Sequence, residues 1–132
     1  MTDACYCAAL RGASRKVTSI YDAALAPIGV TLAQFSLLRT IKREGQLSLT
    51  DLGRLVDLDR STIGRNIKVM RRQGFVTTTS GTDHREARVA LDASGLDVLR
   101  RGAPLWDQAQ DGIRTKLGPD AVHNLLALLQ AL

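Results

Sequence analysis

The fold is decided by one stretch of the chain, residues 59–79, which reads DRSTIGRNIKVMRRQGFVTTT. With Ile63 placed at zero and 100° added for each residue, Ile67 and Met70 fall within about 40° of Ile63, which predicts a buried stripe on a helix. Polar and basic residues fall on the opposite side, between about 140° and 200°. The stretch therefore predicts a helix over 61–73 with one dry face and one basic face. The basic face carries Ser61, Arg65, Lys68 and Arg72, with Thr62 and Val69 beside it.

A β-hairpin is predicted directly after this helix. Gly74 follows the last turn, where a left-handed residue commonly ends a helix. β-branched and aromatic residues predict strands over 75–79 and 87–91, and turn-forming residues join them. Gly64, on the side of the helix, costs about 1 kcal/mol of helix propensity relative to Ala, so we expect something to approach the backbone closely there.

Two further helices are predicted before the basic one. Thr31 and Gln34 match a capping box that opens a helix running to about Lys42, and Ser48 begins a second capping box that opens a short helix ending near Val56. Four residues, 56–59, separate this short helix from the basic helix. Helix, short turn, basic helix and hairpin make up a winged helix-turn-helix, whose second helix enters the major groove of DNA while the hairpin reaches the neighbouring minor groove.

Amphipathic helices flank this unit on both sides, over 7–28 and after Asp92, with Pro104 expected to kink the latter and Gly118 to precede a last helix. They carry more apolar face than the unit can cover, so a homodimer is expected to bury them. The predicted fold class is mostly α with a small β-hairpin wing. The single domain, 1–132, divides into a winged helix-turn-helix over about 30–91 and dimerisation helices over 5–28 and 92–132.

The positive charge of the chain is concentrated in the predicted unit. The 132 residues have a net charge of +5; residues 60–88 hold seven basic and two acidic residues, and the remainder holds eleven of each. Phosphates neutralised by Lys or Arg release condensed counterions, so such a patch suits a polyanion. A solvated helix face is the alternative, but here the basic residues coincide with the outward side of the second helix. We therefore expect double-stranded DNA as the partner, with a pseudo-palindromic operator facing two recognition helices.

Individual side chains on the basic helix suit different DNA contacts. Arg65 can bridge O6 and N7 of guanine, and Asn66 can pair with an adenine edge. Lys68, Arg72 and Arg88 are better placed for phosphates, which position the protein without specifying sequence. Arg71 lies toward the flank of this basic face. A phosphate contact is one role for it, and a helix cap or a salt bridge is an equal alternative.

Other classes of function are disfavoured by the sequence. The N-terminus has no basic segment before an apolar one, so no secretory signal is predicted and a cytoplasmic location is expected. No apolar run approaches the ~18 residues of a membrane span. Phosphate-cradling glycine loops and catalytic constellations are missing, so an enzyme is not expected. A winged helix that acts only through protein contacts is the remaining rival, and the basic outward face argues against it.

No cofactor or metal is expected either. The cysteines and histidines are too scattered for a short-spacing zinc signature, although a dimer brings distant residues together. We interpret His84 at the hairpin tip as a phosphate contact and His123 as a helix-surface residue. The residues concerned are Cys5, Cys7, His84 and His123.

From Cys7 to Leu132 the chain resembles the MarR family of bacterial transcription factors. The motifs are residues 52–56, 59–66 and 73–76, and Asp83-His84-Arg85 ahead of Val89. The resemblance implies a homodimer, held by its intertwined first and last helices, that usually represses genes and releases DNA on sensing a small molecule or oxidant. It also implies that Arg85, oriented by Asp83, enters the minor groove. The predicted DNA-binding residues are thus Ser61, Thr62, Arg65, Asn66, Lys68, Arg72, Arg85 and Arg88.

One departure from the family lies in the rising strand of the wing. That strand usually carries basic residues, whereas here it reads Thr77-Thr78-Thr79-Ser80. Hydroxyl contacts to phosphate are the remaining contribution expected from it.

The first helix is similar to that of the organic-hydroperoxide-sensing branch of the family. This implies that Cys7 is oxidised and that Tyr21 of the partner subunit hydrogen-bonds to it, although Arg11 and Leu32 stand where that branch has further tyrosines. The alternative is that Cys7 is a small buried apolar residue. A third possibility is an anionic aromatic ligand in the crevice between the dimer helices and the DNA-binding lobes, with Arg15 and Tyr21 as polar lining.

Overall fold

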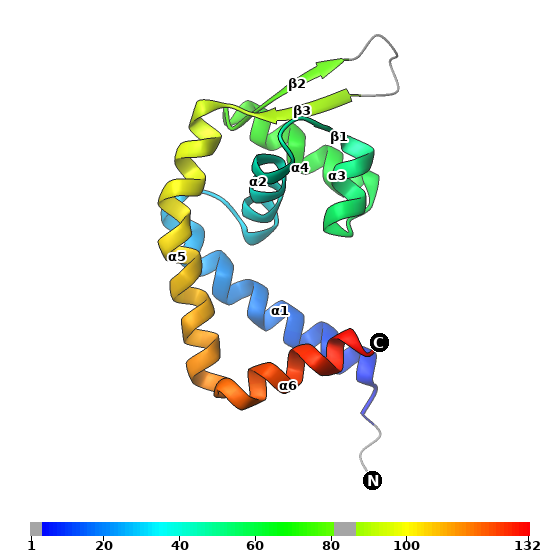
Figure 1. Ribbon diagram of the computed structural model, residues 1–132, viewed down its shortest axis with the longest axis vertical. Coiled ribbons are helices and arrows are strands. Elements are labelled where there is room, and N and C mark those ends of the chain that lie inside the picture. The colour runs from blue at the N-terminus through cyan, green and yellow to red at the C-terminus, as the bar shows by residue number, and fades with distance from the viewer. Residues whose placement is uncertain (1–3, 81–86) are drawn as a thin grey trace.

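The computed structural model describes residues 4–80 and 87–132. It is mostly helical with a small antiparallel sheet at one end, which confirms the predicted fold class (Figure 1). The helices are α1 (Tyr6–Leu25), the short 3-10 helix η1 (Ala26–Ile28), α2 (Leu32–Glu44), α3 (Leu49–Val56), α4 (Arg60–Arg72), α5 (Ala93–Leu117) and α6 (Pro119–Gln130). The strands are β1 (Leu47–Ser48), β2 (Val76–Ser80) and β3 (Ala87–Leu91).

The helices begin and end close to the predicted caps. At α2 both halves of the capping box form: the Gln34 N–H donates to Thr31 Oγ1 (3.2 Å) and the Thr31 N–H donates to Gln34 Oε1 (3.0 Å). At α3 the half that forms is the bond from the Asp51 N–H to Ser48 Oγ (3.1 Å). Gly74 has φ +81°, the left-handed conformation expected after α4. Local chemistry therefore places these ends to within a residue or two.

The wing is a three-stranded sheet rather than a simple hairpin. β3 lies in the middle, paired with β2 (Thr78 opposite Val89) and with β1 (Leu47 opposite Val89), in the order β1-β3-β2. β1 is thus an edge strand that ties the wing to the start of α3. The predicted DNA contact Arg85, with Asp83 and His84, lies outside the described residues.

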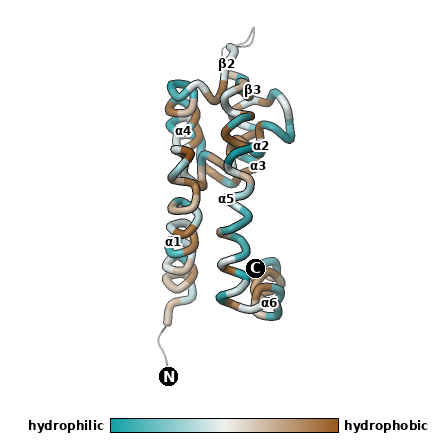
Figure 2. The backbone as a smooth tube through the Cα atoms, turned by 90° about the vertical axis from the view of Figure 1, so that its left-hand side faces the viewer, coloured by the Kyte–Doolittle hydropathy of each residue, from teal (hydrophilic) through white to brown (hydrophobic). Residues whose placement is uncertain are grey.

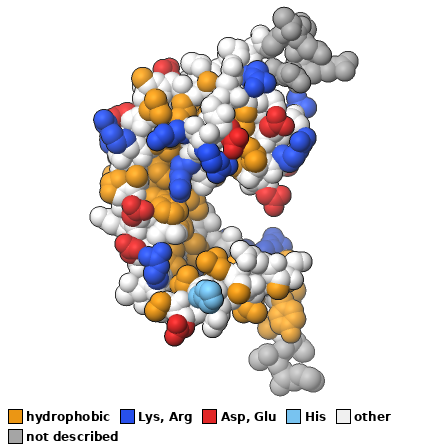
Figure 3. All heavy atoms as spheres, in the orientation of Figure 1, with side chains coloured by type: hydrophobic (Ala, Val, Ile, Leu, Met, Phe, Trp, Pro, Cys, Tyr) orange, Lys and Arg blue, Asp and Glu red, His pale blue; other side chains and the backbone are white. Residues whose placement is uncertain are grey.

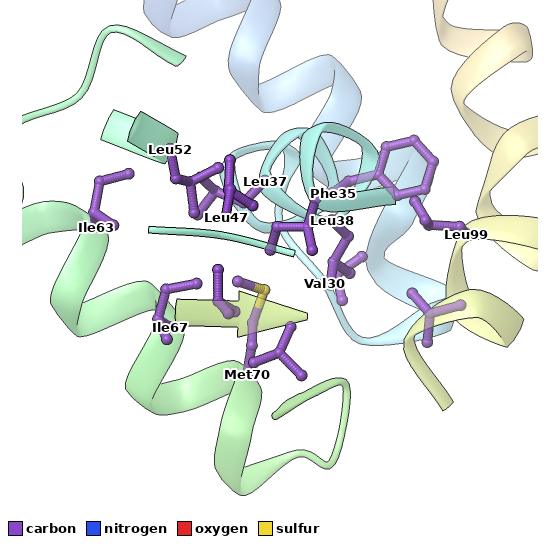
Figure 4. Close-up of a cluster of buried hydrophobic side chains, with 14 of the residues drawn as sticks. Val30, Phe35, Leu37, Leu38, Leu47, Leu52, Ile63, Ile67, Met70 and Leu99 are labelled. Atoms are coloured by element: carbon purple, nitrogen blue, oxygen red, sulfur yellow. The ribbon is translucent and has the colours of Figure 1, made fainter. Parts of the chain in front are cut away.

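The core sits between α2, α4 and the sheet (Figure 4). Phe35, Leu38 and Ile41 of α2 are at most 2% exposed, and the predicted dry stripe of α4 joins them in the same cluster. Burying each such side chain contributes roughly 1.5–3 kcal/mol. The rotation of α4 about its axis is fixed by this packing, so its opposite face points outward.

Two long helices, α1 and α5, leave this lobe, and α6 continues from the end of α5, so the three form an open frame (Figure 1). α5 is a single helix from Ala93 to Leu117, and Pro104 lies inside it without interrupting it. The C-terminal part of α1 packs against α5, and the rest of α1 runs away from it (Figure 1). α6 extends from the far end of α5 and lies apart from α1 (Figure 2). No residue of α6 is buried.

In the described part of the chain no single helix is long and apolar enough to cross a membrane, although the segments Tyr6–Ile28 and Leu32–Glu44, bent by 73°, meet the length and composition criteria together.

Candidate nucleic-acid interface

The outward face of α4 is an exposed row of cations. Arg65, Lys68 and Arg72 are all exposed, while Ile63, on the opposite side of the helix, is fully buried. Within residues 4–80 and 87–132, no acidic side chain forms an ion pair with any of these cations. Lys and Arg side chains gather on the lobe that contains α4 (Figure 3). The face is therefore available to a polyanion.

A small polar cluster orders the first turn of this face. Ser61 Oγ donates to Asp59 Oδ2 (2.6 Å), and Arg65 Nη2 donates to Thr62 Oγ1 (3.3 Å). Hydrogen bonds from Ser61, and next from Thr62, hold the pKa of the Asp59 carboxyl below its usual value. Three predicted DNA-binding residues thus meet around a carboxylate whose orienting role the sequence reasoning missed. The available signal was an Asp at the N-cap position two residues before a Ser.

Asn66 forms a hydrogen bond within its own helix. It is half-buried, and its Nδ2 donates to the Thr62 carbonyl one turn earlier in the same helix (3.1 Å). Beside Gly64 the space is open, since an added Cβ would meet no described protein atom within 4 Å. The close approach expected at Gly64 is therefore not made by the described part of the chain, and it remains a prediction for DNA.

Hydrogen bonds from three long side chains hold the wing. Arg71 Nη1 donates to Thr78 Oγ1 (3.1 Å), which links the last turn of α4 to the middle of β2. Arg88 Nη2 donates to the Gln46 carbonyl (3.0 Å), and Gln46 Nε2 donates to Thr79 Oγ1 (3.3 Å). The threonines of the rising strand thus accept hydrogen bonds from neighbouring elements. For Arg71 the observed partner is the wing, which the sequence did not indicate.

The predicted sensing residues do not meet within one chain. Cys7 and Cys5 are exposed, which contradicts the expectation of a buried Cys7 for the single chain. Tyr21 is buried, and burial raises the pKa of its phenol, an effect that Arg114 opposes. Fourteen residues of helix separate Cys7 from Tyr21, about 21 Å along the axis. A contact between these two side chains therefore requires a second subunit.

A cleft of about 510 Å³ lies between α2 and α5. The Arg39 guanidinium lies 4.5 Å from the ring centroid of Trp106, whose ring centroid is in turn 6.2 Å from that of Tyr21. The contact between Arg39 and Trp106 is a cation–π contact. The residues that line the cleft include Phe35, Arg39, Lys42, Arg43, Leu99, Arg100, Trp106 and Asp107.

This cleft lies between the DNA-binding unit and a predicted dimerisation helix, where the sequence suggested a crevice, but its lining differs from the predicted one. Neither Arg15 nor Tyr21 lines it, and its cations come from α2 and α5. The three cations of α2 follow one another at helical spacing, and that was the available signal; their proximity to Trp106 depends on how the two helices pack. Among the described residues, no three His, Cys, Asp or Glu side chains are placed to hold a metal ion.

In the α3–α4 helix-turn-helix, the second helix, α4, has a dry inner face and a cationic outer face, and a wing follows it. This arrangement defines a winged-helix DNA-binding protein. Residues 28–86 match the model of the MarR family. Over 97% of this chain and 96% of the other, the protein is 35% identical to the M. tuberculosis transcriptional regulator MosR, solved in complex with DNA (TM-score 0.83). The chain belongs to the MarR family and is a DNA-binding transcriptional regulator, not an enzyme.

More distant structures share the fold. A mutant of E. coli MarR complexed with operator DNA has a TM-score of 0.84 at 21% identity, covering 92% of this chain and 89% of that one. The transcriptional repressor CouR, bound to a DNA duplex, has a TM-score of 0.86 at 23% identity, covering 96% and 91%. No curated protein sequence matches the chain significantly.

Proposed function

We propose that the protein is a homodimeric, sequence-specific repressor that inserts α4 into the major groove of a pseudo-palindromic operator and its wing into the adjacent minor groove. The observation that carries this proposal is the exposed cationic face of α4 opposite its buried stripe. Residues of about 30–91 form the DNA-binding unit, and residues 5–28 and 92–132 form the dimer scaffold. MosR, the relative at 35% identity, has been solved with DNA. CouR, a repressor, has been solved with a duplex.

The dimer is supported by apolar side chains that one chain leaves uncovered. Their exposed fractions reach 57% at Leu126, 68% at Leu128 and 93% at Leu132 on the C-terminal arm, and 44% at Leu10 on α1. Several large apolar side chains left exposed on the arms of one chain usually mark an interface. A second copy of the chain presents the same surface, as a two-fold interface requires. Two copies place two α4 helices on one face of DNA.

Arg65→Ala and Lys68→Ala are expected to weaken operator binding in different ways. Loss of Arg65 removes a base-reading fork, which costs roughly 1–3 kcal/mol of discrimination and relaxes the preference for one sequence. Loss of Lys68 weakens all sequences alike and lowers the slope of log affinity against log salt by about 0.9 for each phosphate that is no longer neutralised. Gel shifts on a selected duplex and a scrambled one, at several salt concentrations, measure both effects. The reverse pattern would show that the two roles are wrongly assigned.

We also propose that an anionic aromatic molecule in the α2–α5 cleft releases the DNA. The cleft combines the Trp106 ring with four cations against one carboxylate, Asp107, at its lining. Because α2 belongs to the DNA-binding lobe and α5 to the scaffold, a ligand between them changes the angle of one against the other. Oxidation of Cys7, near the start of α1, is the competing input.

Two probes separate these inputs. Benzoate or salicylate is expected to change the fluorescence of Trp106, the only tryptophan of the chain, and to release operator DNA. In Arg39→Gln both responses become weaker, whereas Cys7→Ser responds as the wild type does. Cumene hydroperoxide is the probe of the competing input. Two results together would show that Cys7, and not the cleft, is the sensor. Peroxide would release operator DNA from the wild type but not from Cys7→Ser, and neither aromatic acid would release it.

A further inference from the structure

Arg71 lies at the junction between α4 and the wing. It belongs to the last turn of α4, is exposed, and lies about 80° around the helix from Ile63, between the buried stripe and the cationic face. Its Nη1 donates to Oγ1 of Thr78, in the middle of β2 (3.1 Å). One hydrogen bond therefore fixes this long side chain across the junction of the two elements that approach DNA.

The path of the DNA brings a backbone strand close to Arg71, provided that the proposed binding mode holds. If α4 occupies the major groove and the wing the adjacent minor groove, the sugar–phosphate strand that separates the two grooves must run between them. A guanidinium at this junction faces that strand. Thr78 occupies one of its N–H groups, and the others remain able to donate to phosphate oxygens. In the described part of the chain no carboxylate forms an ion pair with Arg71.

The arrangement also accounts for the composition of the rising strand. Residues 77–80 carry hydroxyl groups and no cation, and the hydroxyl of Thr78 accepts from an arginine that α4 supplies. Holding that side chain before DNA arrives lowers the entropic cost of the contact. We propose that Arg71 binds a phosphate of the strand between the two grooves, and that Thr78 is the positioning residue that presents it.

Salt-dependent DNA binding tests this pair of roles. The probe is a fluorescein-labelled duplex selected with the wild-type protein from a random library, and the readout is anisotropy at several KCl concentrations. Arg71→Gln is expected to lower affinity about tenfold per half-site at about 0.1 M salt, and to lower the salt slope by about 0.9 per half-site. Thr78→Val keeps the charge of Arg71, so the salt slope stays unchanged. It lowers affinity about threefold per half-site, because the Arg71 side chain is no longer held before DNA binds.

The coupling between the two residues is the sharper readout. In the Arg71→Gln background, Thr78→Val is expected to cause no further loss, because the residue that it positions is gone. Thr78→Ser keeps the hydroxyl and restores binding. Thr77→Val, on the opposite face of the same strand, is the matched control and binds as the wild type does. Unchanged thermal melting of every variant confirms that the fold is kept.

Three results would overturn the inference. They are an unchanged salt slope in Arg71→Gln, additive losses in the double variant, and an equal loss from Thr77→Val, which would indicate direct hydroxyl contacts along the strand. A failure of the proposed binding mode looks different. In that case Arg65→Ala and the wild type bind selected and scrambled duplexes alike.

Discussion

Leu125→Glu together with Leu129→Glu is expected to split the dimer and to lower operator affinity by a factor of about 10²–10⁴, because the avidity of one linked molecule for two half-sites disappears. The two side chains lie within about 40° of each other on α6 and are 41% and 42% exposed in the single chain. In a symmetric interface the new carboxylates face apolar surface and one another, so their desolvation is not offset. Sedimentation and DNA anisotropy measure the two consequences.

The fold of each chain is expected to survive this substitution. No residue of α6 is buried in the single chain, so circular dichroism keeps its helical signal. Gln130→Glu is the control: it adds negative charge to the same helix, about 140° around from Leu125. A variant that sediments as a monomer but binds the operator as tightly as the wild type would contradict the dimeric binding mode.

Gly95→Ala is expected to lower the free energy of unfolding by about 3 kcal/mol, the upper part of the range for overpacking. A Cβ at Gly95 would lie 2.2 Å from the backbone oxygen of Phe75 and 3.2 Å from Leu91 Cδ2. The Phe75 oxygen cannot move freely, because it accepts the Asp92 N–H at 3.0 Å, at the junction between the wing and α5. The substitution therefore pushes α5 away from the lobe. Urea unfolding measures the loss.

Gly112→Ala, in the same helix, is the matched control. Nothing described lies within 4 Å of a Cβ at Gly112, so this substitution is expected to gain up to about 1 kcal/mol of helix propensity. Equal stability of the two variants would mean that α5 does not approach Phe75 as closely as the structure shows.

Most of the fold was predictable because its signals are local. The side chains that cap α2 lie three residues apart, and the stripe of Ile63, Ile67 and Met70 repeats at the helical period. Charge is also a property of the sequence, and the concentration of cations between residues 60 and 88 indicates a polyanion partner because it coincides with the outward face of the second helix of the predicted winged unit. The hairpin strands were placed to within a residue because their β-branched composition is equally local.

The site was less predictable wherever contacts join distant residues. Arg71 meets Thr78, Arg88 meets Gln46, and Arg39 meets Trp106 across separations that no periodic pattern encodes. The expectation that Arg15 and Tyr21 line a ligand crevice placed the polar lining on α1, whereas the cleft lies between α2 and α5. The buried alternative for Cys7 was wrong for the single chain, because one copy leaves the start of α1 uncovered.

The order of residues is sufficient to predict that this chain forms a winged helix with a basic recognition helix between amphipathic arms. Periodicity, caps and charge act over a few residues, and neighbours in the chain carry them. The pairing of β1, the side chains that hold the wing and the cation beside Trp106 depend on how distant elements pack. Those contacts follow from the packing angles of helices and strands, and these angles are set by the whole core rather than by any one segment.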